Sequence, residues 1–213
     1  MTVLRDLSIP SGYRLPGAIS FWGDSTTYGL GVSTTSDTSR SVLSRAFTPD
    51  RLILNMGING EAPTAIADRF LARPDSVRDA TQILYFGRIS YGLPYTVFTE
   101  QCDRVWADRD HDRIAFLVPG PGADVNEMTP GSSQITANND ARAEFIAAYP
   151  DNYIDHMQDM WDAVLPGDAL VDRDAETVGY CPPKFLSDDI HRNAAGQLIE
   201  ATSIFNFITL KGW

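Results

Sequence analysis

Short runs of apolar residues recur along the chain and alternate with longer stretches in which apolar residues repeat at helical spacing. The runs are β-branched or aromatic and mostly free of charge, which is typical of parallel strands buried on both faces. They are Ala18–Trp22, Leu52–Asn55, Ile83–Phe86, Ile114–Val118 and Tyr153–Asp155. The pattern therefore predicts a sheet of about five parallel strands.

Helices are expected between these runs, at about 38–47, 64–72, 96–109 and 137–148. A last helix follows, and its predicted apolar face consists of Leu198, Ala201, Phe205 and Ile208. Strands and helices in alternation predict an α/β fold, a flavodoxin-like doubly wound sheet with helices on both faces, which is an α/β/α sandwich. Ligands bind such sheets at the carboxyl ends of the strands.

The remaining segments divide the chain into an arm and one domain. Residues 1–16 are polar and interrupted by proline, so we interpret them as an N-terminal arm that precedes a domain at 17–213. The Gly- and Pro-rich segment 119–133 predicts a long loop after the fourth strand, at the edge of the sheet where loops commonly carry function. No internal repeat or low-complexity tract is present in the sequence.

Composition narrows the class of protein. The 213 residues are 43% hydrophobic and 21% charged, as in ordinary globular proteins. The net charge of −11 argues against nucleic acid or an anionic membrane as the main partner, because both require basic surface. No apolar run approaches the length of a membrane span, and the N-terminus lacks the apolar core of a signal peptide. We expect a soluble segment, cytoplasmic or part of a phage or secreted assembly, with a trimmed leader or larger parent chain left open.

The two cysteines give no sign of a metal site. Cys102 and Cys181 are far apart in the sequence and fit no metal-ligand spacing. They are either bridged or free, and free buried thiols are the favoured interpretation. No metal is expected.

Candidate chemistry begins in the stretch FWGDSTTYGLG, residues 21–31, where an apolar run ends abruptly in an acid, a serine and glycines. One interpretation is a helix N-cap, because Asp24 and Ser25 can both accept hydrogen bonds from backbone N–H groups. The other is a nucleophilic Ser25 on a strand-to-helix turn. A serine nucleophile needs a base, and the base needs an orienting acid.

Only three histidines are available as that base. His111 lies in the charged segment ADRDHDR and is interpreted as a solvated surface residue. His156 precedes apparent core residues and is interpreted as structural or exposed. His191 lies just before the last helix, with Asp188 three residues upstream, a spacing that lets the carboxylate reach Nδ1 while Nε2 faces Ser25. The alternative is that these acids only decorate a helix N-terminus.

Taken together, these segments resemble the SGNH (GDSL-type) hydrolases over residues 18–213. Gly23-Asp24-Ser25 resembles the first block of that family, NMGING at 55–60 the second, and DDIHRNAAG at 188–196 the Asp-x-x-His block. YFGRIS at 85–90 lies where the third block is expected. The finer similarity is to a bacterial or phage-associated branch of the family.

The resemblance implies a catalytic triad of Ser25, His191 and Asp188 that works without a cofactor. It assigns the oxyanion hole to the backbone N–H groups of Ser25 and Gly60, while Asp24 braces the turn. The third donor of the family, an asparagine side chain, falls on Ile89, which cannot donate a hydrogen bond. The candidate substitutes or substrate-binding residues are Asn59, Arg88, Ser90 and Asn126.

The function implied by the resemblance is hydrolysis of short O-esters, acetyl above all, on a small molecule or a polysaccharide. Some members of the branch accompany sugar-processing or phage tail modules, and this analogy favours carbohydrate. Two alternatives stay open: a lipid esterase or thioesterase, and a carbohydrate-binding pseudo-esterase impaired at Ile89. The nearby aromatic residues Tyr91, Tyr95 and Phe98 either line a sugar site or, as is more common, cap the sheet.

Overall fold

Five parallel strands form a single sheet in the computed structural model, which describes residues 15, 17–87, 96–118, 120, 122–123 and 128–213. In spatial order they are β2 (Ile53–Gly57), β1 (Ile19–Gly23), β3 (Thr81–Tyr85), β4 (Ile114–Leu117) and β5 (Tyr153–Ile154). β2 lies on one side of β1, and β3 lies on the other side of β1. The carboxyl ends of β1 and β3 therefore flank the topological switch point, where doubly wound sheets bind ligands. The predicted fold is confirmed.

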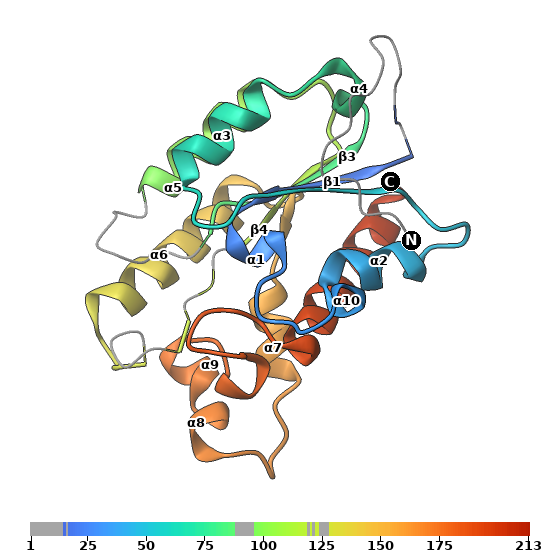
Figure 1. Cartoon of the computed structure of the whole chain (residues 1–213). Helices are drawn as coiled ribbons and strands as arrows, with labels where there is room; N and C mark the ends of the chain where they lie inside the picture. The colour runs from blue at the N-terminus through green and yellow to red at the C-terminus, as the bar shows by residue number, and fades with distance from the viewer. Residues whose placement is uncertain (1–14, 16, 88–95, 119, 121, 124–127) are drawn as a thin grey trace.

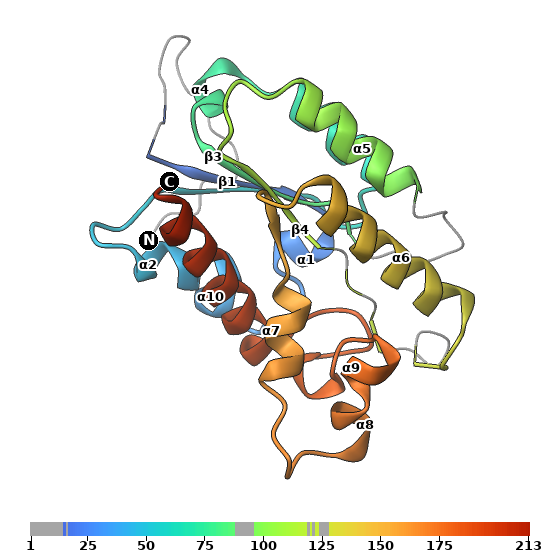
Figure 2. The same cartoon turned by 180° about the vertical axis from the view of Figure 1, so that it is seen from behind.

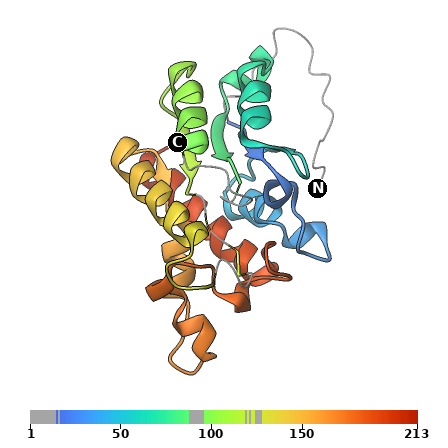
Figure 3. The same cartoon turned by 90° about the vertical axis from the view of Figure 1, so that its left-hand side faces the viewer.

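Helices cover both faces of the sheet (Figures 1 and 2). One face carries α3 (Pro63–Leu71), α5 (Thr96–Ala107) and α6 (Ser133–Ala148), and the other carries α2 (Ser39–Ala46) and α10 (Ala194–Lys211). Shorter elements complete the chain: α1 (Ser25–Tyr28), η1 (Thr35–Asp37), α4 (Asp75–Arg78), α7 (His156–Asp162), α8 (Leu170–Arg173), α9 (Ala175–Val178) and η2 (Pro183–Phe185). Figure 3 shows the orange segment that includes α8 and α9 extending beyond the layered part of the molecule.

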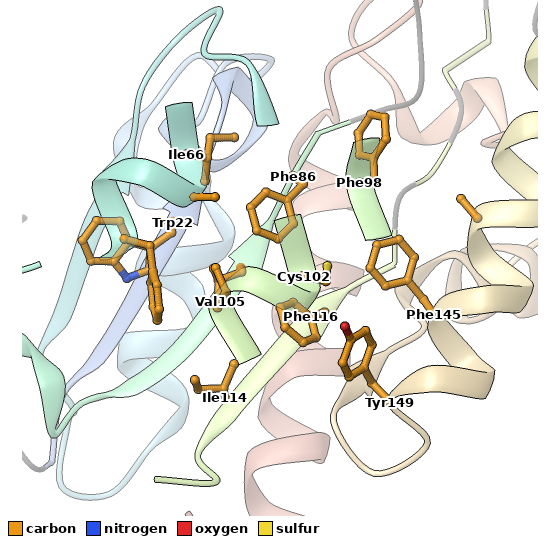
Figure 4. Packing of buried hydrophobic residues seen from close by; sticks show 14 residues of the cluster. Trp22, Ile66, Phe86, Phe98, Cys102, Val105, Ile114, Phe116, Phe145 and Tyr149 are labelled. Atoms are coloured by element: carbon orange, nitrogen blue, oxygen red, sulfur yellow. The ribbon is translucent and has the colours of Figure 1, made fainter. Parts of the chain in front are cut away.

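The strands divide their side chains between two apolar cores because successive residues of a strand point to opposite faces. Trp22, Leu84 and Phe116 point toward α3, α5 and α6, where Phe116 packs against Tyr149 with ring centroids 4.8 Å apart (Figure 4). Phe21 and Ile83 point the other way, toward α2 and α10. Both faces of the sheet are therefore dry, which explains why its strands are uninterrupted apolar runs in the sequence.

The starts of β3 and α6 differ from the prediction because polar residues are buried or act as caps. β3 begins at Thr81 rather than Ile83, since Gln82 lies in the core, where it accepts a hydrogen bond from Trp22 Nε1 at 3.0 Å and donates to two backbone carbonyls. α6 begins at Ser133 rather than near 137, because Ser132 caps it by accepting from the N–H of Ile135 at 3.2 Å.

The apolar face of α10 is rotated from the predicted one. Ala201 and Ile208 are buried as expected, but Leu198 is 52% exposed, so its predicted inward position is wrong. Gln197 and Glu200 are buried instead, at 0% and 2% exposure. Both accept hydrogen bonds from Ser39, Gln197 from its N–H and Glu200 from its hydroxyl, and these bonds are what turns the polar residues inward.

Cys102 and Cys181 are free and buried, as the sequence favoured. Cys102 lies on the buried face of α5, and Cys181 lies in a smaller cluster with Met160, next to α7 and α9. Among the described residues, the helices are all too short or too polar to span a bilayer.

Candidate active site

Ser25 lies at the start of a helix that begins directly after β1. Asp24 caps this helix, α1, through a hydrogen bond from the N–H of Thr26 to its Oδ1, 2.9 Å long. Ser25 is the first residue of α1 and is half-buried at the carboxyl edge of the sheet. The two interpretations of the sequence are therefore compatible, because Asp24 makes the cap while Ser25 is presented by the turn.

The segment that carries His191 is a tight loop joining η2 to α10. The N–H of Ser187 donates to the carbonyl of His191 at 2.8 Å, and Leu186 and Arg192 form an antiparallel bridge across the loop. Asn193 then starts α10 by accepting hydrogen bonds from the N–H groups of Ala195 and Gly196. The conformation of this loop is therefore fixed by hydrogen bonds within the loop itself.

Gly31 brings the chain after α1 against this loop. Its φ is +99°, and a Cβ added there would lie 2.4 Å from the carbonyl oxygen of Arg192 and 2.8 Å from Cβ of His191. A side chain at this position would be strained and would push the loop away from the sheet. Glycine therefore allows the histidine loop to approach α1.

Three side chains meet where these two segments touch. His191 Nε2 lies 3.1 Å from Ser25 Oγ, and His191 Nδ1 lies 2.8 Å from Asp188 Oδ2. The other oxygen of Asp188 accepts from the N–H groups of Ile190 and His191 at 2.7 and 2.6 Å. Partial burial works to raise the pKa of Asp188, but these hydrogen bonds outweigh it and lower the pKa below its ordinary value. Asp188 is thus ionised at neutral pH, and the His191 ring that it contacts faces the hydroxyl of Ser25.

No family model matches the chain, and no curated protein matches its sequence. Solved structures do match its fold. A lipase/acylhydrolase from Enterococcus faecalis superposes with a TM-score of 0.68 at 17% identity, covering 91% of this chain and 96% of that one. A member of the lipolytic protein G-D-S-L family from Veillonella parvula gives 0.60 at 12% identity over 90% and 98%. A GDSL-like lipase from Bacteroides thetaiotaomicron gives 0.64 at 13% identity over 92% and 89%.

This chain has the GDSL hydrolase fold. The similarity extends over nearly the whole of each matched chain, so the overall fold is shared. At these identities the likeness concerns the fold, and the chemistry of this chain rests on its own residues.

Asn59 and Gly60 lie on the same edge of the GDSL fold as Ser25. The N–H of Ile58 donates to the carbonyl of Gly23 at 2.9 Å, which places the loop after β2 beside the end of β1. The loop then turns at Gly60, whose φ is +75°, and both Asn59 and Gly60 are exposed. The backbone of Gly60 is therefore open to a ligand at this edge.

Four other predicted positions, Arg88, Ile89, Ser90 and Asn126, lie outside the described residues, as do Tyr91 and Tyr95. Their roles stay predictions. Phe98 belongs to α5 and is buried in the core. Its role is therefore packing, and it does not line a sugar site.

The other two histidines have hydrogen-bond partners other than Ser25. His111 is half-buried and accepts a hydrogen bond from the N–H of Arg113 at 3.1 Å, so its prediction as a solvated surface residue is wrong. His156 is fully buried, the structural alternative of its prediction. Burial lowers the pKa of His156 well below its ordinary value, and the neighbouring Arg192 lowers it further.

A buried charged cluster behind the site was not predicted from the sequence. It comprises Arg192 and Glu200, which form an ion pair with side chains 5% and 3% exposed, together with His156 and Tyr85. Arg192 and Tyr85 also line a cavity of about 20 Å³ that Asp24 borders, enough for one water. Burial raises the pKa of Asp24, while Thr26 and Arg192 partly oppose this shift.

Within the described part of the chain, no three His, Cys, Asp or Glu side chains gather in a way that could hold a metal ion. The arrangement at the Ser25 edge instead has the parts for covalent acyl chemistry: a hydroxyl, an imidazole acceptor and a carboxylate that fixes the imidazole tautomer.

Proposed function

We propose that the chain is a serine carboxylic ester hydrolase that acts through an acyl-enzyme. The observation that carries the proposal is the hydrogen-bonded series from Asp188 through His191 to Ser25, 2.8 and 3.1 Å long. Ser25 Oγ attacks the ester carbonyl while His191 Nε2 takes its proton. His191 then donates that proton to the leaving alcohol, and water hydrolyses the acyl-enzyme by the same steps. Asp188 keeps the proton of the neutral ring on Nδ1 and stabilises the imidazolium.

The tetrahedral intermediate requires hydrogen-bond donors for its negative oxygen. The N–H of Ser25 is one candidate, because N–H groups in the first turn of a helix lack partners within that helix. The N–H of Gly60 is the second, because the exposed turn of Gly60 lies on the same edge. Asp24 takes no part in proton transfer in this scheme, since its carboxylate is engaged in the α1 cap.

The proposed substrates are short O-acyl esters, acetyl in particular, carried by carbohydrate. This part rests on the sequence resemblance alone, whereas the structurally similar proteins are named as lipases and acylhydrolases. A panel of p-nitrophenyl esters of increasing chain length separates the two. A sharp preference for acetate supports the short-chain proposal, and faster turnover of long chains supports a lipid esterase. Acetate release from a panel of acetylated glycans then identifies the natural carrier.

Covalent labelling by a fluorophosphonate tests the mechanism, because only an activated serine reacts quickly. We expect the wild-type protein to be labelled once, Ser25→Ala not at all, and His191→Ala far more slowly. Ser36→Ala is the matched control: this exposed serine donates to Asp37 at 3.2 Å but has no imidazole partner, so its loss leaves labelling unchanged. A wild-type protein that is inert to the probe and still binds glycan would overturn the proposal in favour of a binding module.

A further inference from the structure

Arg192 connects the loop that carries His191 to the interior of the protein. Its side chain is 5% exposed, whereas that of Asp188 in the same loop is 56% exposed. Its backbone pairs with Leu186 across the loop, and its carbonyl oxygen packs against Gly31. A single residue thus has its main chain beside Gly31, in the segment that follows α1, and its guanidinium in the core.

The guanidinium is held from three different elements. Nη1 forms the buried ion pair with Glu200 of α10, and Nη2 donates to Nε2 of His156, the first residue of α7. The guanidinium also lies over the ring of Tyr85 at the end of β3, 5.4 Å from its centroid. Glu200 is itself fixed by the hydroxyl of Ser39 at 2.7 Å. Because arginine only donates, Nε2 of His156 must accept, and this requires a neutral ring.

The hydrogen bonds of Asp188 act within the loop. They join its carboxylate to the N–H groups of Ile190 and His191 and to the His191 ring, so they fix the ring relative to the loop. The position of the loop relative to Ser25 needs a separate anchor, and the buried contacts of Arg192 provide one.

We propose that Arg192 is a positioning residue for His191, which rests on the proposed esterase function. Its buried guanidinium holds the loop so that the imidazole stays within hydrogen-bond distance of Ser25 Oγ. Misplacing a reacting group by about 1 Å can cost roughly 100-fold in rate, so loss of the anchor affects the chemical step. Substrate binding at the exposed edge does not involve Arg192, and KM is expected to stay the same.

The test compares Arg192→Met with the wild-type enzyme on p-nitrophenyl acetate. We expect kcat to fall about 10- to 100-fold at constant KM, and the rate of fluorophosphonate labelling to fall by the same factor. Arg192→Lys should be intermediate, because an ammonium group keeps a charge for Glu200 but lacks the planar fork that serves two partners at once.

Arg73→Met is the matched control for the loss of a buried arginine. The side chain of Arg73 is 1% exposed and pairs with Asp108 and Asp110. These residues precede β3 and β4, so they lie at the amino ends of the strands, opposite the Ser25 edge. At a temperature where both variants are folded, Arg73→Met should keep the wild-type kcat. An equal loss of kcat in Arg73→Met would make the effect one of general destabilisation and overturn the proposal.

Two further outcomes are decisive. Wild-type kcat in a folded Arg192→Met, or in a folded Arg192→Lys where the methionine variant does not fold, overturns the positioning role and leaves the esterase intact. A wild-type protein without Ser25-dependent labelling overturns the esterase function, and the positioning role with it.

Discussion

Replacing Asp188 with asparagine separates the structural role of this residue from its proposed chemical role. The carboxylate accepts from two backbone N–H groups through Oδ1 and from the His191 ring through Oδ2. In Asp188→Asn the amide oxygen can keep the two backbone bonds, which turns the NH₂ group toward Nδ1. An NH₂ group donates, so Nδ1 becomes an acceptor and the ring proton moves to Nε2. Nε2–H then faces Ser25 Oγ and cannot take its proton.

The size of the effect follows from this change of tautomer. In serine proteases the equivalent substitution lowers kcat by about 10⁴-fold, which corresponds to about 5.4 kcal/mol of activation free energy. Asp188 differs in being 56% exposed, so water competes for its hydrogen bonds and can partly replace them. We therefore expect a smaller loss, about 10³-fold in kcat, or about 4 kcal/mol.

The assay is steady-state hydrolysis of p-nitrophenyl acetate, with circular dichroism to show that the fold is kept. Asp189→Asn is the control, because it removes the same charge from the next residue. The side chain of Asp189 is exposed. The hydrogen bond that Asp189 accepts from the N–H of Ala123 goes to its backbone carbonyl and is kept in the variant. We expect it to keep kcat within about twofold, since exposed charges contribute little. Equal rates for a folded Asp188→Asn and the wild-type enzyme would refute the assignment of Asp188 as the orienting acid.

Three further predictions address the surroundings of the site. Gly31→Ala should lose about 1–3 kcal/mol of unfolding free energy in urea and lower kcat, because its Cβ would meet the His191 loop; Gly131→Ala, also at positive φ but in open space, should keep kcat. His156 stays neutral when folded but gains a proton near pH 6.5 when unfolded, so unfolding free energy should fall between pH 6.5 and 5.5 by at most about 1.4 kcal/mol. His156→Gln should remove that part of the slope in urea titrations at the two pH values, and an unchanged slope would contradict the prediction. Ile89→Asn should raise turnover of an acetyl ester, by up to about 100-fold if Ile89 replaces an oxyanion donor, and a folded variant without a gain would count against the missing donor.

The fold could be predicted because each buried strand is a local signal. Strands covered on both faces must be apolar along their whole length, and residues 19–23 and 114–117 are examples. The short helices α4, α8 and α9 could not be predicted, since four residues make little more than one turn and show no periodicity. Their positions depend on caps and on the surfaces they pack against.

The meeting of Ser25, Asp188 and His191 could also be anticipated, for a topological reason. Ser25 follows β1, and His191 lies in the loop before the helix that returns along the sheet after β5. Segments that follow parallel strands emerge at the same edge, so both residues reach that edge however far apart they are in sequence. Asp188 needs only a local loop to reach the histidine ring.

The misplaced face of α10 and the unpredicted cluster around Arg192 have the same cause. A prediction from helical periodicity assigns glutamine and glutamate to the solvent-facing side. With Gln197 and Glu200 assigned there, the predicted apolar face includes Leu198. In the structure both residues point inward, because Ser39 donates to each of them and Arg192 neutralises Glu200. A buried glutamate is tolerated only when a charge partner compensates it. An acidic residue on the inner side of a helix therefore indicates a buried cation contributed by another segment, and in this chain that cation is the residue next to the proposed catalytic base.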